Sequence, residues 1–282
     1  MSALRVANDH LGDPRRLRAL FDDEGHLFFR DVLDRDAVLE TGRRVMRTVD
    51  ELSGCEDSEL QDALNEQRLW ERLVAVPSLA TFFATIAGAP VGFIPLARYR
   101  IMPPGGVTQV HQDALLNPGF DMTTAWIPLM PISTELGGLA VASGSHRHGC
   151  VPPESLPPLD GSWCSAAYEP GDVVLMNEAL VHTGLPNRSR DSLRVSVDVR
   201  FQSPTAAPAV VGRIVEVDTE SVRIASEADG EVVTLAVDDS TLLRAGSGQR
   251  IPLAELTASE LAPGQRVIAS RREELAVMIK RL

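Results

Sequence analysis

Residues 98–113 read RYRIMPPGGVTQVHQD, and the rest of the chain is best understood from the triplet that ends this stretch, His111-Gln112-Asp113. The first five residues have the character of a strand, and a Pro-Pro-Gly-Gly turn separates them from the triplet. In an extended chain, residues two apart project from the same side, so His111 and Asp113 face one way and Gln112 faces another. An imidazole nitrogen and a carboxylate oxygen on one face provide two of the three ligands of a facial metal site.

The third ligand has to come from elsewhere in the chain, and His182, about seventy residues later, is the best candidate. Two histidines and one carboxylate that leave coordination positions open are the ligand set of non-haem Fe(II) oxygenases. A His-x-Asp pair also arises by chance in many chains, where it has no metal. The motif therefore indicates a metal site only when the surrounding residues support one.

The composition is that of an ordinary globular protein, with 282 residues, 44% hydrophobic and 23% charged. No apolar run approaches the roughly 18 residues that a membrane helix needs, and no signal peptide is evident, so a cytoplasmic protein is expected. The net charge of −12 argues against binding to nucleic-acid phosphates. The three cysteines (Cys55, Cys150 and Cys164) include no Cys-x-x-Cys pair, which indicates neither a disulfide framework nor a zinc knuckle.

Hydrophobic periodicity predicts helices first and strands afterwards. Apolar side chains recur at helical spacing in residues 15–22, 34–49, 58–74 and 77–88, with Gly25 as a break and Asp34 as an N-cap. Short strand-like runs separated by turns follow at residues 93–102, 122–129, 139–142, 173–176 and 193–201. This order predicts a mainly β fold with flanking helices, namely a β-sandwich or jelly roll closed by helices on one side.

The run at residues 193–201 alternates strictly between apolar and polar side chains. Its polar positions are Arg194, Ser196, Asp198 and Arg200. The alternation is typical of an antiparallel strand whose second face meets solvent, but it also suits a binding face. Because Arg194 and Ser196 could hold one carboxylate together, and because they follow soon after His182, the sequence favours an anion site here.

Several motifs now stand in order: His111-Gln112-Asp113, the run TAWIPL at 124–129, GGL at 137–139, GSHR at 144–147, PGD at 170–172, and HTGLPNRS at 182–189 ahead of Arg194. Over about residues 15–203 this set resembles the phytanoyl-CoA dioxygenase family of Fe(II)/2-oxoglutarate-dependent oxygenases. The resemblance implies a double-stranded β-helix (jelly-roll) core. It also implies catalytic iron ligands at His111, Asp113 and His182, and 2-oxoglutarate bound by Arg194, Ser196, Gln112 and Trp126.

The implied activity is that of a dioxygenase that uses Fe(II), 2-oxoglutarate and O₂. It would oxidise, most simply hydroxylate, a C–H bond of a small-molecule metabolite or biosynthetic intermediate, with release of succinate and CO₂. Some family members replace the aspartate and bind halide, so the presence of Asp113 favours hydroxylation over halogenation. In many members the arginine lies one position closer to the distal histidine. Arg194 lies twelve residues after His182, in a region that also holds Arg188 and Arg190.

The substrate is less well indicated than the cofactors. Arg98 and Arg100 share a strand face and could meet an anionic group, and Gln109 and Asn117 are further candidates for the pocket. Two other functions stay open: a cupin-like metalloenzyme that does not use 2-oxoglutarate, and a non-catalytic binding protein on the same fold.

A second domain is expected at the C-terminus. Residues 204–208 read PTAAP, which is typical of a linker between a jelly-roll domain at 1–204 and a small domain at 209–282. Alternating strands and an Asp-Gly turn in the second part predict a small β-barrel of the OB or SH3-like kind. This barrel lacks the aromatic and basic pattern of nucleic-acid binders, so we expect a docking module or the interface of a homodimer. Neither nucleic acid nor membrane is an expected partner.

Overall fold

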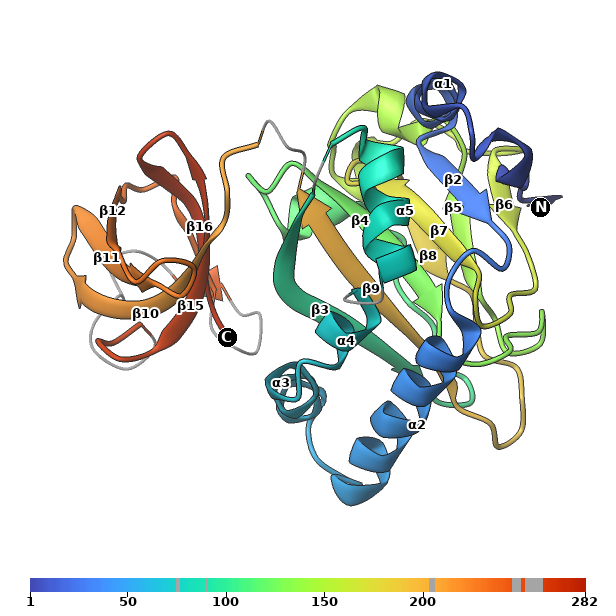
Figure 1. The fold of residues 1–282 in the computed structure, drawn as a ribbon, viewed down its shortest axis with the longest axis horizontal. Coiled ribbons are helices and arrows are strands. Elements are labelled where there is room, and N and C mark those ends of the chain that lie inside the picture. The colour runs from blue at the N-terminus through green and yellow to red at the C-terminus, as the bar shows by residue number, and fades with distance from the viewer. Residues whose placement is uncertain (75–76, 90, 203–205, 245–249, 252–260) are drawn as a thin grey trace. The chain divides into compact units, whose positions relative to one another are not determined.

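The computed structural model of the chain describes residues 1–282 except 75–76, 90, 203–205, 245–249 and 252–260 (Figure 1). The chain forms two compact units, one of Met1–Leu116 with Met122–Pro204 and the other of Asn117–Asp121 with Thr205–Leu282. The predicted linker at 204–208 lies partly outside the described residues. No helix in the described ranges combines the length and the apolar composition needed to cross a bilayer.

The first helices begin and end where the sequence predicts. Helix α1 (Pro14–Glu24) ends at Gly25, whose left-handed φ of 74° suits a residue without a side chain. Strand β2 (His26–Phe29) follows, and Asp34 then caps α2 (Arg35–Glu51) by accepting a hydrogen bond from the Ala37 N–H. The short 3-10 helices are η1 (Asn8–His10), η2 (Ser145–His148) and η3 (Pro153–Ser155).

The helix predicted at 58–74 is two helices in the structure, α3 (Asp57–Glu66) and α4 (Leu69–Val74). They are separated at Arg68, whose positive φ of 51° is incompatible with a continuous helix. Helix α5 (Pro77–Ala87) comes next and lies over the largest sheet of the first unit (Figure 1). It packs there through Phe83, whose ring centroid lies 5.2 Å from that of Phe201.

The first unit contains two sheets, which confirms the predicted jelly roll with flanking helices. The five-stranded sheet is antiparallel and has the order β2-β7-β4-β9-β3, formed by β2 with β7 (Val173–Asn177), β4 (Met122–Pro128), β9 (Arg194–Gln202) and β3 (Gly92–Met102). The four-stranded sheet has the order β1-β6-β5-β8, with β1 (Ser2–Ala3), β6 (Trp163–Ser165), β5 (Leu139–Ala142) and β8 (His182–Gly184).

Strand β9 shows how the layers are filled. Its apolar residues Val195, Val197 and Val199 belong to the core cluster that also contains side chains of the helices. A second cluster joins the two sheets, for example through Trp126 of β4 and Val141 of β5. All nine residues of β9 are buried, so its polar face lies inside the unit and is not the solvent face of an antiparallel strand.

The second unit is a small β-barrel, as predicted. Its closed ring consists of β10 (Val210–Val217), β11 (Ser221–Ser226), β12 (Val232–Ala236), β16 (Leu275–Arg281) and β15 (Arg266–Arg272), and a pairing of β12 with β16 completes it. Two strands that the sequence did not indicate, β13 (Leu242–Arg244) and β14 (Arg250–Ile251), extend the sheet beyond β16. The expected docking or dimerisation role of this unit stays a prediction.

Candidate metal centre and its cavity

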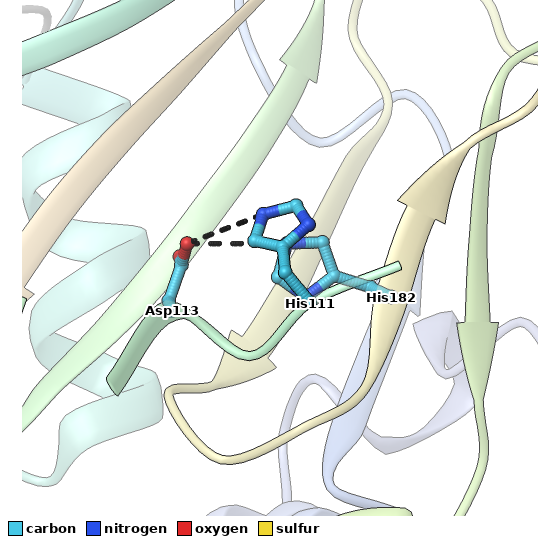
Figure 2. Close-up of side chains that lie close together, drawn as sticks. All are labelled: His111, Asp113 and His182. Carbon is cyan, nitrogen blue, oxygen red and sulfur yellow. Dashed lines mark ion pairs between the residues drawn. The ribbon is translucent and has the colours of Figure 1, made fainter. Parts of the chain in front are cut away.

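The structure brings together the three side chains that the sequence singled out, although they come from different elements. His111 forms a bridge with His182 of β8, in which each backbone N–H donates to the other residue's carbonyl at 3.1 and 3.0 Å. Asp113 opens the short helix α6 (Asp113–Leu116). One ligand atom from each residue lies within 4.8 Å of the others, which is close enough to hold one metal ion (Figure 2).

Hydrogen bonds to backbone carbonyls orient both imidazole rings. His111 Nδ1 lies 2.7 Å from the carbonyl oxygen of Gln109, and His182 Nδ1 lies 2.9 Å from that of Leu180. Because a carbonyl only accepts, each Nδ1 carries the proton and each Nε2 keeps its lone pair. These two Nε2 atoms lie 3.8 and 3.9 Å from Asp113 Oδ1. The bare nitrogens therefore face the carboxylate, as metal ligands would.

The surroundings favour the protonation states that a metal site needs. Burial, followed by the neighbouring imidazole of His182, lowers the pKa of His111 to about 4. Burial alone would raise the pKa of Asp113, but the charges of Arg200 and Arg100 and the hydrogen bond that Thr124 donates to Oδ2 outweigh it. The pKa of Asp113 therefore lies well below its usual range. A neutral imidazole and an ionised carboxylate are the forms that bind a divalent cation.

A cavity beside the two histidines is lined by both polar and apolar side chains. Its lining consists of Arg100, Thr108, His111, Trp126, Leu139, Met176, His182, Gly184, Arg194 and Asp198. Arg194 is only 1% exposed, and its Nε has no hydrogen-bond partner among the described residues. Burial and then the charge of Arg100 lower the pKa of Arg194 to about 10. A buried guanidinium with unused donors is a favourable place for a carboxylate to bind.

The other residues that the resemblance implied for the co-substrate differ in their surroundings. Ser196, fully buried on the same strand face as Arg194, has an Oγ without a partner among the described residues. Trp126 lines the cavity and packs edge-on against Tyr168 at 4.6 Å between ring centroids. The amide nitrogen of Gln112 donates to two backbone carbonyls, at 2.8 and 2.6 Å, and its oxygen accepts the Val151 N–H. Its amide thus holds the surrounding loops.

The two arginines predicted for the substrate share a sheet face but have different partners. In the register of β3 with β9, Arg98 lies opposite Asp198 and Arg100 lies opposite Ser196. Arg100 points into the cavity, where its Nε and Nη2 lie 2.9 and 2.8 Å from Asp198 Oδ2. Arg98 instead pairs at 2.7 Å with Asp57, a largely exposed carboxylate at the start of α3. Arg100 is therefore the better placed of the two to meet a bound molecule.

The remaining substrate candidates are not among the cavity-lining residues. Gln109 is exposed, and its carbonyl accepts the hydrogen bond from His111 Nδ1. Asn117 belongs to the short segment that groups with the second unit. A role for either side chain in substrate binding stays a prediction.

Thr124, Gly184 and Asp198 lie around the centre, although their residue types did not indicate a role there. A period of two could have indicated them. Gly184 lies two residues after His182 on the short strand β8, and Asp198 lies four residues after Arg194 on β9. Thr124 similarly lies two residues before Trp126 on β4. Residues two or four apart on a strand project from one face.

Comparison with known proteins adds independent information. The sequence model of the phytanoyl-CoA dioxygenase family matches residues 21–195. The 1-deoxypentalenic acid 11-beta-hydroxylase of Streptomyces arenae is 28% identical over 238 residues, which cover 68% of this chain and 82% of that protein. The enzyme of the same name from Streptomyces exfoliatus is 27% identical over 237 residues, with the same coverage.

Solved structures with the same fold include two non-haem enzymes. The epimerase SnoN, in complex with Fe3+, alpha-ketoglutarate and nogalamycin RO, aligns with a TM-score of 0.54 at 20% identity, covering 70% of this chain and 86% of that one. The non-heme monooxygenase ThoJ in its apo form gives 0.56 at 18% identity, covering 76% and 85%. At these identities the alignments show a common fold.

Proposed function

Because the chain belongs to the phytanoyl-CoA dioxygenase family, we propose that it is a dioxygenase dependent on Fe(II) and 2-oxoglutarate. It would oxidise, most simply hydroxylate, a C–H bond of a small-molecule metabolite or biosynthetic intermediate, with release of succinate and CO₂. The observation that carries this proposal is the arrangement of His111, Asp113 and His182 beside a cavity that contains the buried guanidinium of Arg194. The hydroxylase names of the two Streptomyces relatives support the same reaction class.

The donor set fits a ferrous ion. Two imidazole nitrogens and one carboxylate oxygen form the facial triad of non-haem iron oxygenases and leave the remaining positions for other ligands. Thr124 fixes the carboxylate of Asp113, since its hydroxyl donates to Oδ2 at 2.6 Å and leaves Oδ1 facing the histidines. Such second-layer hydrogen bonds orient metal ligands and raise the affinity for the metal.

The protein also offers a site for the far carboxylate of 2-oxoglutarate. The planar guanidinium of Arg194 can donate two parallel hydrogen bonds to it, and the hydroxyl of Ser196 can add a third. When bound, iron and 2-oxoglutarate supply the activation of O₂, and the residues of the cavity orient the substrate and exclude water. The largely apolar side chains of Trp126, Leu139 and Met176 in the cavity wall help to exclude water.

Gly184→Ala should weaken the binding of 2-oxoglutarate. A Cβ at Gly184 would lie 3.1 and 3.3 Å from the two terminal nitrogens of Arg194 and 2.8 Å from Thr108 Oγ1, so the guanidinium has to move. We expect the KM for 2-oxoglutarate to rise about tenfold, equivalent to about 1.4 kcal/mol, with little change in iron affinity. Steady-state kinetics and an iron titration measure the two quantities.

Gly92→Ala is the matched control, because nothing lies within 4 Å of the Cβ that it would add to strand β3. It should leave both quantities near their wild-type values. An unchanged KM in a well-folded Gly184→Ala protein would contradict the proposed position of the co-substrate.

Anaerobic titration tests the function as a whole. Addition of Fe(II) and 2-oxoglutarate to the metal-free protein should produce a weak visible charge-transfer band, and admission of O₂ should release succinate. Iron binding without the band and without succinate would favour the cupin-like alternative. Absence of iron binding would favour a non-catalytic protein.

A further inference from the structure

One acidic side chain in the cavity has no role in the proposed binding of iron or 2-oxoglutarate. Asp198 lies in the middle of β9, is 2% exposed and lines the same cavity as His111 and His182. Its Oδ2 accepts a hydrogen bond from Arg100 Nε at 2.9 Å and forms an ion pair with Arg100 Nη2 at 2.8 Å. Its Oδ1 has no hydrogen-bond partner among the described residues. Arg100 thus fixes the carboxylate and leaves one oxygen as an unused, buried acceptor.

The unused groups of this face differ in the kind of partner that they need. Arg194 has a free donor at Nε, and Ser196 has a hydroxyl that can donate. The 2-oxoglutarate dianion carries only acceptor oxygens, so it suits these two groups. It cannot donate to Asp198 Oδ1, and like charges would repel it from that oxygen. Of the molecules in the proposed reaction, the substrate is therefore the one that can donate to Oδ1.

A buried charged acceptor that stays without a donor is destabilising, so native structures rarely keep one unless a ligand, an ion or an ordered water uses it. We propose that Asp198 Oδ1 is a specificity-determining acceptor for the substrate. The substrate class would be small molecules that carry a hydroxyl or amine near the oxidised carbon. This inference rests on the proposed function, since it assigns the substrate of the same cavity.

Discrimination by such a group should be large. A site that hydrogen-bonds a substrate hydroxyl strongly rejects the analogue that lacks it, because the buried acceptor is then left unpaired. We expect a hydroxyl- or amine-bearing compound to bind at least about tenfold more tightly than its counterpart without that group. In this reading Arg100 is a positioning residue, since it acts through Asp198.

The experiment uses the holoenzyme and a panel of small cyclic alcohols and amines, each paired with its deoxy or deamino counterpart. Binding is measured without O₂, as the shift that each compound causes in the visible band of the Fe(II)–2-oxoglutarate complex. Turnover is measured separately, as succinate released above the substrate-free level. The donor-bearing member of a pair should bind more tightly and stimulate more succinate. Equal affinities within the pairs would overturn the proposal.

Variants locate the group responsible. Asp198→Asn keeps the shape but removes the charge. Because Arg100 donates to one atom of this group, the amide oxygen should turn towards Arg100 and the amide nitrogen, a donor, should take the place of Oδ1, so the affinity ratio within a pair should fall towards one. Glu169→Gln is the control, because it removes a carboxylate from an exposed ion pair with Arg35, and it should leave the ratio as in the wild type. A ratio that survives Asp198→Asn would assign the discrimination to another group and overturn the proposal.

Two further results separate this inference from the function on which it rests. If neither the visible band nor succinate appears in the wild type, the proposed function fails and the inference fails with it. If the band appears but no compound binds, a crystal structure of the iron and 2-oxoglutarate complex decides. An Oδ1 of Asp198 that faces the cavity supports the proposal, and one that accepts from a protein N–H overturns it.

Discussion

Asp113→Ala should abolish iron binding at micromolar metal and reduce turnover to background. The substitution removes the negatively charged ligand atom and leaves the two imidazoles of His111 and His182, which are neutral when they bind a cation. Loss of a residue that only supports a metal ligand typically costs 10–100-fold in metal affinity, so loss of the ligand itself should cost more than about 100-fold. Anaerobic Fe(II) titration and succinate release measure the effect.

Thr124→Val provides an intermediate reference for the iron affinity of Asp113→Ala. Valine keeps the branched shape on β4 but cannot donate the 2.6 Å hydrogen bond to Asp113 Oδ2. We expect iron affinity to fall about tenfold, between the wild type and Asp113→Ala. An Asp113→Ala protein that still binds iron and shows the visible band would refute the ligand assignment, whatever the result for Thr124→Val.

Much of the fold follows from local patterns. Asp34 predicts the start of α2 because its side chain can accept from the first turn, and Gly25 predicts the end of α1 because it tolerates a positive φ. The alternation in residues 193–201 predicts a strand with two different faces. The break at Arg68 and the small strands β13 and β14 escaped prediction, because they depend on tertiary packing and carry little periodicity of their own.

The candidate site likewise contains contacts that residue types and order predict and contacts that depend on tertiary structure. The approach of His111, Asp113 and His182 was predicted from residue types and order, although Asp113 opens a helix where an extended chain was expected. The pairing of Arg100 with Asp198 was not predicted. It depends on the register between β3 and β9, two paired strands that lie far apart in the sequence. A single sequence carries no direct signal of such a register.

Arg194→Gln is expected to raise the KM for 2-oxoglutarate about 100-fold. Hydrogen bonds to charged groups contribute about 1.5–3 kcal/mol each, and the loss of about 3 kcal/mol corresponds to that factor. Iron affinity should change little, because Arg194 is not a proposed ligand. Arg194→Lys should recover only part of the loss, since an ammonium group cannot donate two parallel hydrogen bonds to one carboxylate. Measurement of KM separately from iron affinity distinguishes this loss from misfolding.

Two neighbouring arginines serve as controls for the assignment of the carboxylate site to Arg194. Arg188 and Arg190 precede Arg194 in the same region and were the competing candidates by position, but both are exposed. Arg188→Gln and Arg190→Gln should therefore leave the KM for 2-oxoglutarate within about twofold, because exposed charges are screened and contribute little. A large effect from either, with none from Arg194→Gln, would move the carboxylate site to the surface loop. The free donor of Arg194, which is buried and lines the same cavity as the histidines and Asp198, would then have to serve another ligand.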